Sequence, residues 1–138
     1  MSTKAVRVIL ETRLASWAAG RGTPLRVAYE NAPFTPAGGE TYLRAWLLPA
    51  QTTAEDLAGA LRTYRGVFQI DIVRPINGGA GPALDIAAEL NTQFPVNGRY
   101  TSGAVTVQVI SPASAGPGLQ EENAYVVPVS FEYRADVI

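Results

Sequence analysis

The stretch that decides the fold, residues 64–94, reads YRGVFQIDIVRPINGGAGPALDIAAELNTQF. Its first half alternates between apolar and polar side chains, which is the period of a strand with one buried face. The alternating residues are Phe68, Gln69, Ile70, Asp71 and Ile72. The pattern predicts a strand over residues 67–73, with Gln69 and Asp71 on the side that faces away from the core.

The second half of the stretch has the spacing of an amphipathic helix. Pro82 suits a first helical turn, because its missing N–H lies where no intrahelical bond is made. Apolar residues then recur at three- and four-residue intervals, at Ala83, Ile86, Ala87, Leu90 and Phe94. We therefore predict a helix over residues 82–94, joined to the preceding strand by a flexible glycine-rich turn.

Outside this unit the chain has one more helix pattern and four more strand patterns. The helix is expected over residues 3–19, and the strands over residues 25–29, 41–48, 105–109 and 125–133. Pro128 falls inside the last strand and predicts an edge position or a bulge, because proline cannot donate to a ladder. The segment 51–62 fits either a short helix or a connecting loop.

Together these elements predict a single α+β domain over residues 1–138. We expect a mainly antiparallel sheet of about five strands with two helices packed on one face. The other face of the sheet would carry polar side chains of both signs. Our candidate interface on that face consists of Arg44, Trp46, Gln69, Asp71, Glu132 and Arg134. With Asp71 at this surface, Asp71→Ala is expected to leave the stability of the monomer nearly unchanged.

The composition argues against several functional classes. Eleven basic and twelve acidic residues nearly cancel, so no strong field draws the chain to DNA or to a membrane surface. The chain has no His and no Cys, which removes histidine general bases, the usual nucleophile pairs and the common zinc ligands. We expect no enzyme, and we assign no catalytic, cofactor-binding or metal-binding residue.

Two weak signals for chemistry remain. The acid pairs Glu55-Asp56 and Glu121-Glu122 are sequence neighbours, and neighbours on a strand point to opposite faces and form no dyad. The turn 77–81 invites comparison with a phosphate-binding loop, but no Lys-Ser/Thr follows Gly81 and the spacing of a dinucleotide motif fails. A small-molecule binding module or carboxylate enzyme would need an apolar pocket with convergent polar groups.

Two ordered sets of residues carry a resemblance to a known family. The first set is Tyr29-Glu30-Asn31-x-Pro33-Phe34-x-Pro36, then Tyr42-Leu43-Arg44, then Leu48-Pro49. The second set is Arg65-Gly66-x-Phe68-Gln69-Ile70, then Pro75, then Gly79-x-Gly81 before the helix 84–94 with its Phe-Pro stop, and finally the strand 126–134. This order resembles the tail-terminator-like proteins of long-tailed bacteriophages and prophages. The helical pattern at 57–62 is stronger than the resemblance requires.

The resemblance implies a structural protein of the virion tail, assembled in the bacterial cytoplasm, with an α+β fold. Such proteins form a ring, usually a hexamer, on the head-proximal end of the tail tube, where they stop polymerisation and present the head-joining surface. The implied partners are copies of the chain itself, the major tail tube protein and the head–tail connector. DNA would pass through the ring without sequence-specific contact, and no membrane is involved. The alternative is another head–tail joining or tail-tube structural role.

Overall fold

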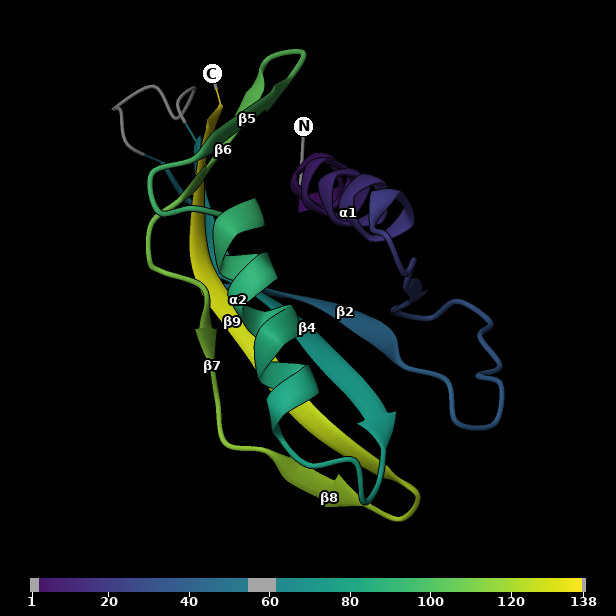
Figure 1. The fold of residues 1–138 in the computed structure, drawn as a ribbon. Coiled ribbons are helices and arrows are strands. Elements are labelled where there is room, and N and C mark those ends of the chain that lie inside the picture. The colour runs from purple at the N-terminus through teal and green to yellow at the C-terminus, as the bar shows by residue number, and fades with distance from the viewer. Residues whose placement is uncertain (1–2, 55–61, 138) are drawn as a thin grey trace.

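The computed structural model describes residues 3–54 and 62–137 (Figure 1). Two helices and a large sheet make up this part of the chain. The helices are α1 (Thr3–Gly20) and α2 (Gly81–Gln93). The strands are β1 (Arg26–Tyr29), β2 (Tyr42–Pro49), β3 (Thr53–Ala54), β4 (Arg62–Pro75), β5 (Arg99–Ser102), β6 (Val105–Val109), β7 (Ser114–Ala115), β8 (Leu119–Glu121) and β9 (Ala124–Val137). The α+β class is confirmed.

The described strands form one sheet in the order β1-β2-β4-β9-β6-β5, with β3 also paired to β4, and β7 and β8 to β9. The long strands β4 and β9 pair along their whole length and form its backbone. Strand β1 runs parallel to β2. The prediction of a mainly antiparallel sheet of about five strands is therefore wrong, because the sheet has nine strands within the described residues and is mixed.

The parallel pair depends on a crossover loop, residues 30–41, that the sequence identifies only as irregular. This loop carries the chain back to the end of the sheet from which β1 started. Arg26 of β1 holds the loop, since its guanidinium bonds Glu40 at 2.7 and 2.8 Å and the carbonyl of Thr35 at 2.9 Å. Phe34 packs between Arg26 and Tyr42, with ring centroids 5.0 Å apart in the Phe34–Tyr42 pair.

Pro128 lies in a central strand, so the predicted edge position is wrong. The register runs through it without a bulge, with Pro128 opposite Asp71 of β4. In an antiparallel sheet the N–H and the C=O of one residue point toward the same neighbouring strand. The carbonyl of Pro128 accepts a bond from the N–H of Gly116 at 2.7 Å, so its missing donor faces the connection between β7 and β8. The pairing of β9 with β7 and β8 is interrupted at that connection, so a residue without an N–H is tolerated at position 128.

Both helices bury their apolar stripes in one core cluster with the same face of the sheet. Helix α2 packs over β4 and β9, whereas α1 contacts β1 and β2 near one edge and β5 and β6 at the other (Figure 1). The sheet therefore curls around α1. At the centre, the ring of Phe68 lies 6.2 Å from that of Phe94 and 5.7 Å from that of Phe131.

The ambiguous segment 51–62 is only partly described. Its start forms the short strand β3, which pairs with the beginning of β4. The helical pattern at 57–62, apart from Arg62 at the start of β4, and the acid pair Glu55-Asp56 lie outside the described residues.

Candidate assembly surfaces

The face of the sheet that carries no helix, here called the open face, holds all six residues of the candidate interface. Cross-strand partners place them in adjacent rows on β2, β4 and β9. The rows are Arg44, Asp71 and Pro128, then Trp46, Gln69 and Ser130, then Leu48, Val67 and Glu132, then Arg65 and Arg134. The alternation read from the sequence thus places these side chains on a common surface.

Asp71 is the centre of a hydrogen-bonded network on the open face. Its carboxylate accepts bonds from Nε1 of Trp46 at 3.0 Å and Nε2 of Gln69 at 2.8 Å, and Nη2 of Arg44 lies 3.3 Å away. These longer side chains cover Asp71 and leave it only 6% exposed. The expectation that Asp71 is a surface residue with no part in monomer stability does not fit this geometry. The network instead fixes the indole of Trp46, which is 38% exposed.

Arg44 links this network to the hairpin of β8 and β9. Its Nη2 lies 3.1 Å from Glu121, the first member of the acid pair Glu121-Glu122. Burial opposes the charge on Arg44, but the bonds and charges of Glu121 and Asp71 outweigh it and keep the pKa of the guanidinium above its ordinary value. Glu121 therefore serves as an ion-pair partner and is not placed for acid–base chemistry with Glu122.

An apolar hollow of about 280 Å³ lies beside this network on the open face. Leu48 and Ile110 line it and are 48% and 41% exposed, and Val67 lies between them in the register. Arg65 and Glu132 form part of its rim. The sequence pattern showed that both faces of β2 carry bulky residues, but it gave no sign that Ile110 would lie beside them. Ile110 follows β6, and its position at the hollow depends on the bond from its N–H to the carbonyl of Glu132.

A row of basic residues crosses the open face next to the hollow. Arg65 of β4 pairs in register with Arg134 of β9, Arg134 with Gln108 of β6, and Gln108 with Arg99 of β5. Arg134 is bonded to Asp136 at 3.1 Å. Arg65 has no ion pair with any residue that the structure describes. Sequence reasoning missed this row because its members come from four strands whose register is not readable from a single chain.

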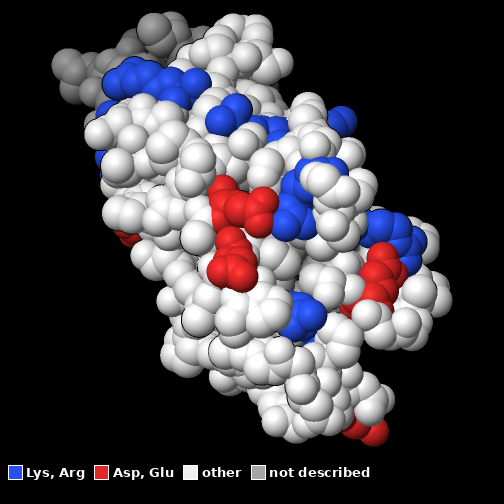
Figure 2. All heavy atoms as spheres, in the orientation of Figure 1, with Lys and Arg blue, Asp and Glu red and all other residues white. Residues whose placement is uncertain are grey.

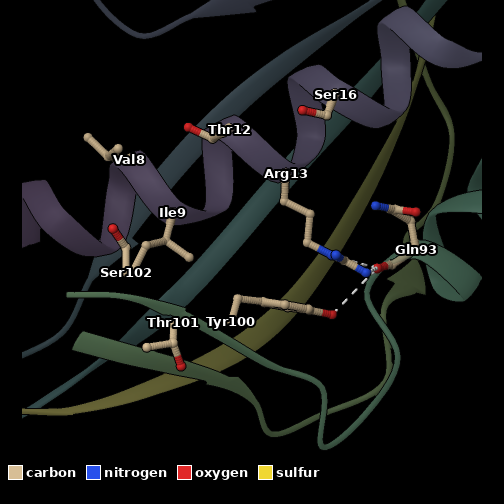
Figure 3. Close-up of a pocket in the computed structure, with 9 residues that line it drawn as sticks. All are labelled: Val8, Ile9, Thr12, Arg13, Ser16, Gln93, Tyr100, Thr101 and Ser102. Carbon is tan, nitrogen blue, oxygen red and sulfur yellow. Dashed lines mark hydrogen bonds between the residues drawn. The ribbon is translucent and has the colours of Figure 1, made fainter. Parts of the chain in front are cut away.

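A second concavity, of about 340 Å³, opens between α1 and β5 (Figure 3). In it, Arg13 of α1 reaches across to the last turn of α2 and donates two bonds to the carbonyl of Gln93, at 3.0 and 2.8 Å. The hydroxyl of Tyr100 points to the same carbonyl, and the guanidinium of Arg13 lies 4.0 Å from the centre of the Tyr100 ring. Arg13, Tyr100 and the carbonyl of Gln93 bond one another, so this groove ties the two helices together.

No cluster of three or more acidic side chains that could hold a metal ion occurs in residues 3–54 and 62–137. Neither described helix is long and apolar enough to cross a bilayer.

Comparison with known proteins agrees with this picture. The family model described as phage tail terminator protein matches residues 5–133. A solved structure whose title states no function is 42% identical in sequence, with a TM-score of 0.83 over 98% of this chain and 96% of that one. No curated protein matches the chain significantly. The match over residues 5–133 includes nearly all of both helices and of the sheet, and five of the six candidate interface residues. The chain belongs to the phage tail terminator family, whose members are structural proteins of the tail.

Proposed function

We propose that this protein forms a ring on the head-proximal end of a phage tail tube, ends tube polymerisation there and presents the surface that joins the head. The observation that carries the proposal is the family match over residues 5–133. The open face supports it, because a tryptophan held by a buried carboxylate beside an apolar hollow has the character of protein–protein contact sites, where Trp and Arg are enriched.

Within the proposed interface the six residues have two kinds of role. Trp46, Glu132 and Arg134 touch the partner directly, whereas Asp71 and Gln69 hold the exposed groups in place from behind. Arg44 joins the two sets through Asp71 and Glu121. The partners are copies of the chain itself in the ring, the major tail tube protein below it and the head–tail connector above it, and the site of action is the virion tail.

The direct test mixes purified protein with its own tail tubes and images the product by electron microscopy. We expect a ring at one end of each tube and no further growth of tubes that carry it. Rings need not form in dilute solution, because the tube can act as a template. Protein that neither forms rings nor binds a tube end would contradict the proposal.

A genetic test separates the terminator role from its alternative. Particles assembled without this protein should have overlong tails, because nothing ends polymerisation. Tails of normal length that lack heads would favour a head–tail joining role instead.

A further inference from the structure

The side of the molecule opposite the open face also carries an exposed apolar residue beside an acid. Figure 2 shows acidic atoms gathered over α2, and this helix contributes Asp85 and Glu89. Glu89 is bonded to Arg21 at 2.8 Å. Asp85 has no ion pair within the described part of the chain, and its neighbour Leu84 is 50% exposed. Leu84 and Asp85 therefore form an apolar knob with an unmatched negative charge.

The open face offers the complementary features at one place. Leu48, Val67 and Ile110 line a hollow of about 280 Å³, which is large enough for a leucine side chain. Arg65 lines the same hollow, together with Glu132. Arg65 lies directly opposite Arg134 and makes no ion pair within residues 3–54 and 62–137. Asp136, bonded to Arg134 at 3.1 Å, already offsets part of the repulsion between these two arginines, and its charge also reaches Arg65. A carboxylate placed directly at Arg65 would offset more of it, because like charges directly opposite on a sheet disfavour one another.

We infer that Leu84 of one subunit enters the Leu48–Val67–Ile110 hollow of a second copy of this chain, with Asp85 paired to Arg65. The inference rests on the proposed ring and names the contact that closes it. Because knob and hollow lie on opposite sides of the sheet, the contact is heterologous. An open row of subunits keeps an unused knob at one end and an unused hollow at the other until rotation closes a ring. The contact of Leu84 with the hollow buries apolar surface, and the pair of Asp85 with Arg65 fixes the position of one subunit relative to the other.

Charge exchange tests the contact on tail tubes. Arg65→Glu alone sets a glutamate against Asp85 at every interface, and Asp85→Arg alone sets Arg65 against an arginine. Each variant should need at least about tenfold more protein than wild type for half-maximal capping, because like charges then meet. A one-to-one mixture should recover wild-type capping, since alternating subunits pair opposite charges at every contact, and the double variant should recover as well.

Matched controls reverse charges elsewhere on the surface. Lys4→Glu and Glu122→Arg lie at exposed sites outside the knob and hollow, and both should cap like wild type. Circular dichroism confirms that each variant is folded. Folded single variants that cap normally, or a mixture that fails to recover, would overturn the inference.

Cysteine cross-linking gives an independent readout, because the chain contains no Cys. The variant with Val67→Cys and Leu84→Cys should give disulfide-linked dimers and larger species on capped tubes under oxidising conditions. A control with Leu84→Cys and Leu119→Cys places the second thiol on another exposed leucine and should remain monomeric. Equal yields in the two variants, or links to the tube protein, would contradict the contact.

The outcomes separate the two proposals. Rings that cap tubes but respond to neither charge exchange nor cross-linking would reject this contact and leave the terminator function standing. Wild-type protein that forms no ring and binds no tube would reject both.

Discussion

At the scale of single residues, Asp71 connects the stability of the monomer to the surface that it offers. Asp71→Ala removes the acceptor of the Trp46 indole and the Gln69 amide and leaves Arg44 without its nearest buried partner. Buried donors without acceptors cost about 1–3 kcal/mol, so we expect the free energy of unfolding to fall by about that amount in urea titrations. Glu132→Ala, on the same face but exposed, should change it by less than about 0.5 kcal/mol. Equal stability of the two variants would show that the network contributes nothing to folding.

Gly66 marks the closest approach between β4 and its neighbours. A Cβ there would lie 2.5 Å from the carbonyl oxygen of Leu48 and 2.7 Å from the hydroxyl of Tyr133. The carbonyl belongs to the ladder and cannot move away, so Gly66→Ala should destabilise the fold by about 1–3 kcal/mol, as overpacking does. Gly81→Ala is the matched control, because nothing lies within 4 Å of its Cβ position. A thermal melt in which the control loses more stability than Gly66→Ala would contradict the packing around β4.

Glu40 should titrate far below an ordinary glutamate. Hydrogen bonds from Arg26, and then from the N–H of Ala37, lower its pKa from 4.5 to about 2. Because the folded pKa is depressed, the contribution of Glu40 to holding the crossover loop is fully present above pH 4.5 and disappears as the pH falls through about 2. The carboxyl carbon resonance of Glu40 should therefore have its midpoint near pH 2. A midpoint at the ordinary value, or one unchanged by Arg26→Gln, would show that the pair does not form in solution.

At the scale of elements, long periodic segments were predictable and short or non-local ones were not. The helix 82–94 matches α2 to within a residue, because its periodicity reports burial directly. The strand 67–73 lies inside β4, which begins earlier, at Arg62, and ends later, at Pro75. Strands β3, β5, β7 and β8 have two to four residues each, which is too few for an alternation to show. The parallel direction of β1 is set by the path of a loop held by Arg26 and Glu40, which no periodicity encodes.

In the candidate site, too, some features could be read from periodicity and others depend on contacts between separate strands. Alternation alone placed Arg44, Trp46 and Gln69 on one face. The burial of Asp71 depends on three covering side chains from two strands. The hollow depends on Ile110, which directly follows β6 and whose N–H bonds the carbonyl of Glu132 in β9. These features arise from register between strands, and a single sequence does not specify register.

Arg13 of α1 ties that helix to the end of α2, in addition to the ion pair between Arg21 and Glu89. Arg13→Ala removes both bonds to the carbonyl of Gln93 and the stacking on Tyr100 (Figure 3). Hydrogen bonds from a charged donor contribute about 1.5–3 kcal/mol, so α1 should open more readily and its amides should exchange faster with solvent. Thr12→Ala, one residue earlier and exposed, should leave exchange unchanged. Equal protection of α1 in both variants would show that Arg13 does not hold it.

At the scale of the whole molecule, one core joins every major element. The buried cluster contains residues of α1, α2 and the long strands without division. We expect unfolding in a single cooperative transition, with coincident far- and near-ultraviolet circular dichroism melts. Two separated transitions would indicate that α1, with the strands at the sheet edges, is a separate folding unit.

The molecule as a whole is two-sided. Helices fill one face of the sheet, and the other face keeps a tryptophan, a hollow and a row of arginines exposed. A protein that acts alone has no need to leave such a face uncovered, whereas a subunit of a larger assembly does. This asymmetry suits a ring in which each copy uses one side to hold its neighbour and the other to be held.

The position of β9 has a consequence for synthesis. Residues 124–137 form the strand between β4 and β6, yet the ribosome makes them after every other described element. Until they emerge, β4 and β6 have no central partner, and the pairings that close the sheet span long separations in sequence, which slows folding. The nascent chain thus cannot complete its open face until residues 124–137 have been made.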